Sequence, residues 1–315
     1  KSHAEGSITT AIGDYSHAEG FNGQAIGSYS HTEGDRTTAI GDLSHAEGGF
    51  TIAVGDRSHA EGSGSIASGS YSHAEGIFTT TIGSGSHAEG FTTTAIGDYS
   101  HAEGRLTTAE GEYSHAEGTG TIALGNYSHA EGNETTTTAA GQWSHAEGNN
   151  TVTIGYISHA EGTATTTIGD FSHTEGSATT AVGDNSHAEG RFNIAVGDNS
   201  HAEGYITIAK GHASHVEGRE TTTEGEYSHA EGRVNIAVGH YSHAEGYQTK
   251  TIGQYSHTEG EKTTAKGNAS HAEGLHTITA KDYQSVVGEY NLEDTDAYFL
   301  IGDGTSDGNR HNLLE

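Results

Sequence analysis

Ser2-His3-Ala4-Glu5-Gly6 is the stretch that decides the fold of this 315-residue chain. The pattern recurs every fourteen residues in twenty copies, with Thr or Val sometimes replacing its Ala and with one slip of two residues. The serine that begins each copy stands at 2, 16, 30, 44, 58, 72, 86, 100, 114, 128, 144, 158, 172, 186, 200, 214, 228, 242, 256 and 270. A fixed short period is typical of a solenoid, in which each repeat forms one coil and packs on its neighbours.

Bulk composition alone would indicate a different structure. Only 31% of the residues are hydrophobic and the formal net charge is -30, a combination typical of disordered chains. The repeat outweighs this signal, because a solenoid coil needs only a few small inward residues. Pro is absent, as expected where nearly every backbone N–H is needed for a hydrogen-bond ladder.

Several classes of partner are disfavoured by the sequence. The acidity argues against nucleic acid, whose phosphates require Lys and Arg. No apolar run approaches the roughly 18 residues of a membrane helix, so we expect no membrane insertion, and no signal peptide is visible. With no Cys there is no disulfide or thiolate metal site, and the redox compartment is not indicated. The start in mid-repeat and the absence of Met predict a fragment of a longer protein.

One coil can be written from residue 2 to residue 15. We predict strands over residues 2–6 and 9–13, joined by corners at residues 7–8 and 14–15. Because strand side chains alternate between faces, the positions that accept only small residues must point into a narrow lumen between the two strands. The predicted lumen residues are Ala4, Thr9, Ala11, Ala18 and Ala39.

The outward faces of the two strands differ in tolerance. His3 and Glu5 leave one strand together, and their positions never change in twenty copies. The position of Ile12, on the other strand, also accepts Lys and Glu, as at Lys210 and Glu224, so it is at least partly wet. We infer that the His–Glu face is buried against identical chains. The predicted interface residues are His3, Glu5, His17, Glu19, His31, Glu33, His45, Glu47, His59, Glu61, His101, Glu103, His145, Glu147, His201, Glu203, His271 and Glu273.

The two corners also differ. One carries an aromatic residue in most coils, and rungs about 4.8 Å apart would stack these rings into a ladder. This ladder includes Tyr15, Tyr29, Tyr71, Tyr99, Tyr113, Tyr127 and Trp143. The other corner is variable, and its large apolar residues are either incidental packing or contacts with a receptor: Phe21, Phe50, Ile77, Phe78, Phe91, Phe192, Tyr205 and Tyr247.

The repeat predicts a β-roll over residues 1–288, with a two-residue insertion within residues 133–140 that lengthens a corner. Residues 284–288 keep the period but lose His and Glu. Residues 289–315 are predicted to form a cap or a transition to a further domain, with a strand at residues 298–301.

The register Gly13-Asp14-Tyr15-Ser16-His17-Ala18-Glu19-Gly20 resembles the head repeats of YadA-type trimeric autotransporter adhesins, over residues 2 to about 288. The resemblance implies an all-β, left-handed parallel β-roll in a homotrimer, with the strand that begins at Ser16 facing the partners. In those heads the outward pair on that strand is typically aliphatic. Here it is His and Glu, so we expect a polar, titratable interface. About 21 coils at ~4.8 Å each would make a rod about 100 Å long.

The tail resembles a second family. Residues 288–291, followed by residues 302–310, are similar to phage tail appendage proteins whose repeats lead into a self-cleaving C-terminal chaperone. We therefore predict a structural shaft or spike of a phage tail appendage, located on the virion. The alternative is a bacterial cell-surface adhesin whose variable corners bind host matrix or glycan. A more distant alternative is an ice-binding solenoid, suggested by Thr-rich strands such as residues 79–81.

The repeated His–Glu pair could in principle carry chemistry. Catalysis needs a cleft and one distinctive copy, so we expect no enzyme and no cofactor. Metal ions in layers about 4.8 Å apart would repel one another, which leaves at most one or a few occupied axial sites at His3, Glu5 and their repeats. The favoured hypothesis is His hydrogen-bonded to Glu within or between chains, with carboxylates that pair with protonated His or share protons. Asp303 and Asp307 are better explained by a turn than by calcium.

Overall fold

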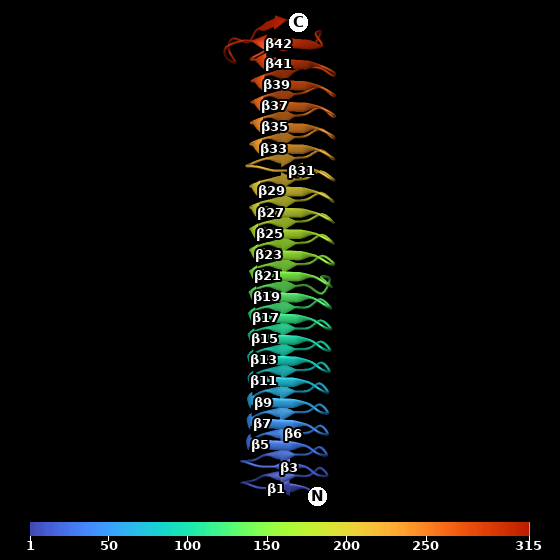
Figure 1. Ribbon diagram of the computed structural model, residues 1–315, viewed down its shortest axis with the longest axis vertical. Coiled ribbons are helices and arrows are strands. Elements are labelled where there is room, and N and C mark those ends of the chain that lie inside the picture. Colours follow the sequence, from blue (N-terminus) through green and yellow to red (C-terminus); the bar gives the residue numbers. More distant parts are fainter. Residues whose placement is uncertain (315) are drawn as a thin grey trace. The chain divides into compact units, whose positions relative to one another are not determined.

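The computed structural model describes residues 1–314 as an all-β parallel solenoid of about 22 coils with fourteen-residue spacing. The predicted all-β parallel solenoid is therefore confirmed. The chain divides into two compact units, residues 1–161 and residues 162–315. Within each unit the coils follow one another in chain order (Figure 1). Each coil gives one strand to a first sheet, which carries His and Glu, and one to a second sheet.

In the first unit the strands of the first sheet are mostly five residues long. They are β1 (His3–Ala4), β3 (His17–Ala18), β5 (His31–Asp35), β7 (His45–Gly49), β9 (His59–Ser63), β11 (His73–Ile77), β13 (His87–Phe91), β15 (His101–Arg105), β17 (His115–Thr119), β19 (His129–Asn133), β21 (His145–Asn149) and, reaching residue 163, β23 (His159–Thr163). The second sheet has two-residue strands: β2 (Thr10–Ala11), β4 (Gln24–Ala25), β6 (Thr38–Ala39), β8 (Ile52–Ala53), β10 (Ile66–Ala67), β12 (Thr80–Thr81), β14 (Thr94–Ala95), β16 (Thr108–Ala109), β18 (Ile122–Ala123), β20 (Thr136–Thr137) and β22 (Val152–Thr153).

The second unit repeats this arrangement. Its first sheet contains β25 (His173–Ser177), β27 (His187–Arg191), β29 (His201–Tyr205), β31 (His215–Val216), β33 (His229–Arg233), β35 (His243–Tyr247), β37 (His257–Glu261), β39 (His271–Leu275), β41 (Ser285–Glu289), β42 (Phe299–Asp303) and β43 (Asn312–Leu314). Its second sheet contains β24 (Thr166–Thr167), β26 (Thr180–Ala181), β28 (Ile194–Ala195), β30 (Ile208–Ala209), β32 (Thr222–Thr223), β34 (Ile236–Ala237), β36 (Lys250–Thr251), β38 (Thr264–Ala265) and β40 (Ile278–Thr279).

The strands differ from the predicted spans in a regular way. In the first sheet they begin at His rather than Ser, and the five-residue ones extend one residue past Gly. In the second sheet they end before the glycine. There the Ala25 carbonyl accepts hydrogen bonds from the backbone N–H groups of both Ile12 (2.8 Å) and Gly13 (3.5 Å). Two residues of one coil thus bond to one residue of the next, and the regular strand pairing ends.

Parallel pairing keeps every repeat position above its own copy. His45 pairs with His59, and Ala46 with Ala60, in neighbouring strands of the first sheet. The N–H groups of His3, Glu5 and Ser7 donate to carbonyls of the next coil, each at 2.9 Å. These continuous ladders run along the stack, so deformation of a coil must break backbone hydrogen bonds.

The core is a file of small side chains. Ala18 and Ala39 are fully buried, as are the residues at the same positions of most other coils. Ala4, Thr9 and Ala11 lie in the first coil, which has one neighbouring coil, and they are partly or fully exposed. The interior therefore has room for Ala and Thr, and this limits how much apolar surface one chain buries.

Glycines stand where backbones of adjacent coils meet. A Cβ atom built on Gly55 would lie 2.1 Å from the Gly69 carbonyl oxygen. At the corners, by contrast, side-chain-bearing residues adopt left-handed backbone, with φ of 59° at Tyr29 and 55° at Arg36. The Tyr29 N–H donates to the Asp14 carbonyl at 2.8 Å, so the ladder of the neighbouring coil holds this unfavourable conformation.

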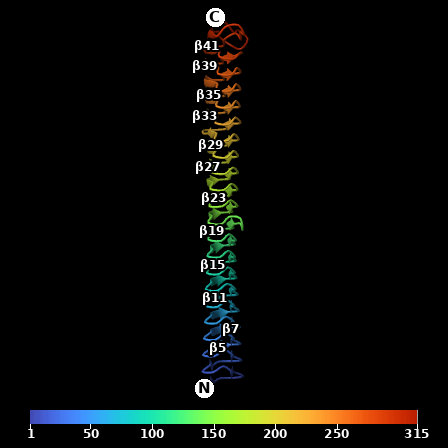
Figure 2. The same ribbon diagram turned by 90° about the vertical axis from the view of Figure 1, so that its right-hand side faces the viewer.

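The two extra residues enlarge the aromatic-side corner of one coil. Residues 122–123 pair with residues 136–137, fourteen positions away. Residues 129–133 and 136–137, by contrast, pair with residues 145–149 and 152–153, sixteen positions away. The additional length therefore lies after Thr137, where the Gly141 N–H closes a turn on the Thr138 carbonyl at 2.9 Å. Figures 1 and 2 show this green loop, between β20 and β21, projecting from the stack.

The fourteen-residue register continues one coil beyond the sequence repeat. β41 pairs in parallel with β42, which places Gly302 beside Gly288 and buries Leu300 at the position of the repeat alanine. β43 then pairs antiparallel with β42. Among residues 1–314 no helix is long and apolar enough to cross a membrane.

Candidate functional site: the His–Glu face

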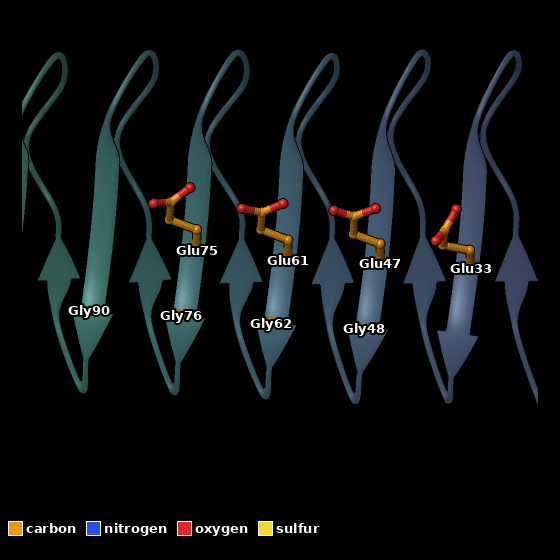
Figure 3. A pocket seen from close by; sticks show the side chains of 8 residues that line it. All are labelled: Glu33, Glu47, Gly48, Glu61, Gly62, Glu75, Gly76 and Gly90. Atoms are coloured by element: carbon orange, nitrogen blue, oxygen red, sulfur yellow. The ribbon is translucent and has the colours of Figure 1, made fainter.

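The His–Glu face consists of the outward His and Glu side chains of the first sheet. Parallel pairing stacks the imidazoles: the rings of His59 and His73 have centroids 4.8 Å apart and planes within 2°. The Glu side chains form a second file beside them, over a groove of about 470 Å³. Figure 3 shows its lining residues, Glu33, Glu47, Gly48, Glu61, Gly62, Glu75, Gly76 and Gly90.

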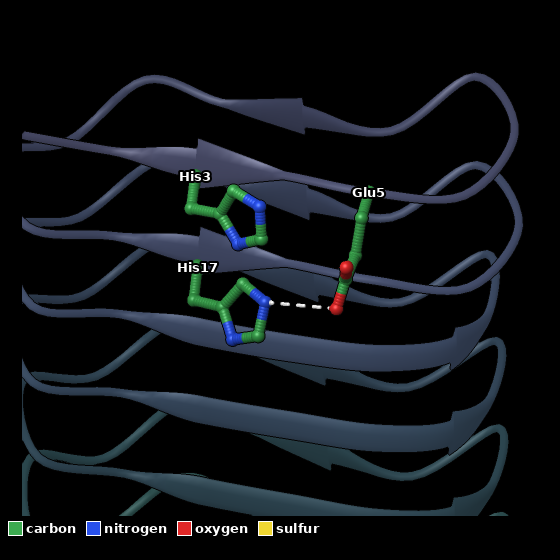
Figure 4. Close-up of side chains that lie close together, drawn as sticks. All are labelled: His3, Glu5 and His17. Carbon is green, nitrogen blue, oxygen red and sulfur yellow. Dashed lines mark ion pairs between the residues drawn. The ribbon is translucent and has the colours of Figure 1, made fainter.

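The two files lie close but are not hydrogen-bonded through His Nε2. Figure 4 shows Glu5 reaching toward the next coil, where its Oε1 is 3.6 Å from Nε2 of His17. Glu47 lies between two rings, with Oε2 3.8 Å from Nε2 of His45 and Oε1 3.9 Å from Nε2 of His59. These Nε2 atoms are buried and lack a hydrogen-bond partner within the chain. Within one chain, therefore, the hydrogen-bonded His–Glu pair that we expected does not form at these positions.

The imidazoles favour the neutral state. Burial, followed by the neighbouring rings of His115 and His145, lowers the pKa of His129 to about 4. The pKa of His45 is lowered for the same reasons, burial first and then His31. Of the two alternatives for the carboxylates, pairing with protonated His therefore does not apply to these residues at neutral pH.

The carboxyl groups instead share protons along their file. A hydrogen bond to Glu47 raises the pKa of Glu61 to about 7, and the same bond lowers the pKa of Glu47. Glu103, between Glu89 and Glu117, likewise has a pKa raised to about 7, chiefly by its hydrogen bond to Glu117. The formal charge of -30 therefore overestimates the negative charge of the folded chain near neutral pH.

The face is only half covered in a single chain. The side chains of His45 and Glu47 are each 33% exposed. The opposite face exposes Ile40 and Ile82 to 42% and 52%. The residues predicted at the interface are thus brought together in one continuous strip within each unit.

A further constant residue, the repeat serine, was not assigned a role in the sequence analysis. Ser30 is buried, and its hydroxyl donates to the Gly27 carbonyl at 2.6 Å. Ser44 makes the same bond to Gly41. In most coils the serine closes the corner that leads into the His–Glu strand in this way, and the hydroxyl of Ser200 is an exception without a hydrogen-bond partner. The presence of the serine in all twenty copies was the signal that could have revealed this role.

The aromatic corner forms interrupted stacks rather than one ladder. Tyr99, Tyr113, Tyr127 and Trp143 stack in sequence, the last pair with centroids 4.1 Å apart. Tyr15 stacks on Tyr29 at 5.1 Å. Tyr71 has no aromatic neighbour at this corner, because Arg57 and Gly85 occupy the adjacent coils; its ring lies under the Arg57 guanidinium at 5.0 Å.

The variable corner gathers aromatic and Arg side chains. The Arg36 guanidinium lies 5.9 Å from the Phe21 ring and 4.8 Å from the Phe50 ring. A pocket of about 370 Å³ is lined by Phe50, Ser63, Gly64 and Phe78. Three more of the predicted contact residues are exposed, at Ile77, Phe91 and Phe192. Tyr205 and Tyr247 are half-buried beneath the guanidinium groups of Arg219 and Arg233, respectively.

Six stretches of the chain match the model of the YadA head domain repeat, at residues 18–44, 33–58, 46–72, 116–136, 133–156 and 175–200. These stretches are YadA-like head repeats. No curated protein matches the chain. YadA head repeats form a structural, adhesin-type fold rather than an enzyme family, and they indicate a surface-exposed or extracellular head or fibre of trimeric type.

Proposed function

We propose that the chain forms a homotrimeric, rigid shaft or spike of a phage tail appendage, in which the His–Glu faces of three chains pack together. The observation that supports the trimer is that the His and Glu of this face are the same in all twenty coils, whereas the residues of the opposite face vary. A surface that contacts its own copies at every level must keep the same side chains at every level. The trimeric nature of YadA heads supports the same assembly.

In a single chain, polar atoms of the His–Glu face lack hydrogen-bond partners that a neighbouring chain would supply. Nε2 of His73 and of His101 is buried without a hydrogen-bond partner, and unsatisfied buried polar atoms are costly. A neighbouring chain that brings its own carboxylates could accept hydrogen bonds from such atoms. The small-residue interior also buries little apolar surface, so lateral packing would add stability that each chain lacks.

The function proposed is mechanical: display of other parts at a distance, with contact to a host surface as a further role. Backbone ladders along each unit supply stiffness. The phage assignment rests on the resemblance of residues 288–291 and 302–310 to phage tail appendage proteins. The second candidate, a cell-surface adhesin that binds host matrix or glycan, is favoured by the Arg36–Phe50 cluster and the pocket at Phe78.

The test of assembly is the solution mass by light scattering at neutral pH. We expect three times the 32.6 kDa of one chain. Substitution of Glu61 and Glu75 by Lys should dissociate the trimer, because three added positive charges would meet at each level. The matched control is Ile82→Lys on the opposite face, at a repeat position that already holds Lys210 and Lys266. A monomeric parent, or a double variant that stays trimeric, would contradict the proposed interface.

The two settings can be separated by location. Antibodies to the chain should label tail appendages of phage particles in electron micrographs. Labelling of intact bacterial cells in the absence of phage would favour the adhesin.

A further inference from the structure

Glu47 and Glu131 of the His–Glu face each lie between two imidazoles of consecutive coils. Glu131 has Oε2 3.7 Å from Nε2 of His129 and Oε1 4.0 Å from Nε2 of His145. The arrangement at Glu47, between His45 and His59, is the same. In both cases the nitrogen–oxygen distances exceed that of a hydrogen bond, so the three groups face one another without bonding directly.

The three groups offer a set of ligand atoms. One ligand atom from each of His45, Glu47 and His59 lies within 4.8 Å of the other two, and among residues 1–314 fourteen further groups of at least three such side chains meet the same limit. Nε2 of both histidines is buried and without a hydrogen-bond partner, so it is available as a ligand. In a single chain the side chains of His59 and Glu47 are each 33% exposed, which leaves a path for an ion from solvent.

We propose that the His–Glu face binds divalent first-row metal ions, Zn²⁺ foremost, each held by Nε2 of two histidines one coil apart and by the carboxylate of the glutamate between them. Imidazole and carboxylate are ordinary ligands of zinc, and three protein ligands leave the fourth position for water. Ligand atoms of a tetrahedral zinc site lie about 3.4 Å apart, given bonds of about 2.0–2.1 Å. Small tilts of the rings and of the carboxylate would close the gap to that distance.

The sharing of histidines limits how many sites can be filled. His59 belongs both to the group with His45 and Glu47 and to the group with Glu61 and His73. One Nε2 atom binds one ion, so two consecutive groups cannot both be occupied. Occupation of alternate coils also places ions about 9.6 Å apart, and this halves the Coulomb repulsion expected for ions in every coil. With twelve repeat histidines in the first unit and eight in the second, at most six and four ions bind, or ten per chain.

This inference does not rest on the proposed trimer, because one chain supplies all three ligands of a site. Solution mass tests the trimer, and metal content tests the sites. A monomer that binds ten ions would contradict the trimer and support the metal sites. A trimer that binds no ions would support the trimer and contradict the metal sites.

The experiment is equilibrium dialysis of the 315-residue chain against Zn²⁺ at pH 7.5, with metal content per chain as the readout. We expect saturation near ten ions. Substitution of His31, His59, His87 and His115 by Asn leaves no consecutive pair between His17 and His129, and it should remove four ions. Substitution of His212 and His240 by Asn, at corner positions off the face, should leave ten. Saturation at twenty or at fewer than three, or equal binding by the four-site variant and the parent, would overturn the proposal.

A second measurement needs no variant. Cu²⁺ is added in steps from half of saturation to saturation, and an electron paramagnetic resonance spectrum is recorded at each step. As the sites fill, we expect increasing dipolar broadening from ions about 9.6 Å apart. A spectrum of isolated ions that persists at saturation would contradict occupation of alternate coils.

Discussion

The imidazole rings of His45 and His59 stack with centroids 4.7 Å apart and planes 2° from parallel. The spacing is imposed by parallel backbone pairing, since His45 lies directly beside His59 in the next strand. Burial lowers the pKa of both histidines, and the charge of the preceding ring lowers it further: that of His31 at His45, and that of His45 at His59. The pitch of the coil thus determines the protonation of the face.

Acid should therefore destabilise the fold. A folded-state pKa below 6.5 means that unfolding takes up protons, so stability is full above about pH 6.5 and is lost as the pH falls toward about 4. At least eleven histidines have lowered pKa values, with His129 and His243 at about 4. Four glutamates with raised pKa values, including Glu61 at about 7, act in the opposite sense as the pH falls from 7 to 4.5, but they are fewer.

Melting temperatures by circular dichroism from pH 7.5 to pH 4 test this balance. We expect a progressive fall below pH 6.5. The variant with Asn at 212 and 240 should give the same profile, because these histidines lie off the face. A melting temperature that rises on acidification would mean that the glutamates dominate.

Because adjacent coils approach closely at some glycines and not at others, we expect Gly→Ala substitutions at two positions to change the free energy of unfolding very differently. In Gly55→Ala the new methyl would lie 2.1 Å from the Gly69 carbonyl oxygen, and we expect a loss of about 1–3 kcal/mol or more. Gly49→Ala is the control, because a Cβ atom there meets nothing within 4 Å. It should be neutral or stabilise by about 0.4–1 kcal/mol. Urea unfolding of both variants measures the difference, and equal costs would refute the predicted contact.

Loss of the buried polar side chain of Asn235 should lower the free energy of unfolding. Its Oδ1 accepts from the Thr249 N–H at 2.8 Å, and its Nδ2 donates to the carbonyls of Glu231 and, at 2.7 Å, Gly246. Asn235→Ala leaves these groups unpaired and should cost about 1–3 kcal/mol. Thr221→Ala, at the same repeat position, removes one bond to the Glu217 carbonyl and should cost less. Denaturant midpoints measured side by side decide the order; the reverse order would contradict it.

The single Trp reports on the aromatic stack. Trp143 packs on Tyr127 with planes 4° apart, so Tyr127→Ala should uncover it and increase its quenching by iodide. The lost stacking should cost about 0.5–1.5 kcal/mol beyond lost burial. Tyr15→Ala, distant in the same unit, should leave the quenching unchanged. Unaltered quenching in Tyr127→Ala would show that the two rings do not stack in solution.

The sequence predicted the parts of the fold that depend on period and size. The fourteen-residue spacing indicated a parallel solenoid, and the restriction to Ala or Thr indicated which side chains, such as Ala39, are inward. A strand at residues 298–301 was predicted, and β42 lies there, but its parallel pairing with β41 in the fourteen-residue register was not predicted. The coil around Leu300 and Gly302 replaces the small alanine by a larger side chain, so the period persists while the motif does not.

The chemistry of the site was less predictable. Constancy of His and Glu marked the face, but protonation depends on distances between neighbouring coils that no single repeat contains. The left-handed backbone of Tyr29 and Arg36 was also hidden, since such residues seldom adopt it and only ladder bonds from the adjacent coil hold it there.

The lengthened corner after Thr137 has a consequence for how the chains of the proposed trimer align. A stack of identical coils is unchanged by a shift of one period, so chains displaced by one coil would still bring His and Glu to the same level nearly everywhere. The sixteen-residue step from Thr137 to Thr153 breaks this translational symmetry. Chains displaced by one coil would set the enlarged turn of one chain level with an ordinary corner of the next, so the enlarged turn favours the alignment without displacement.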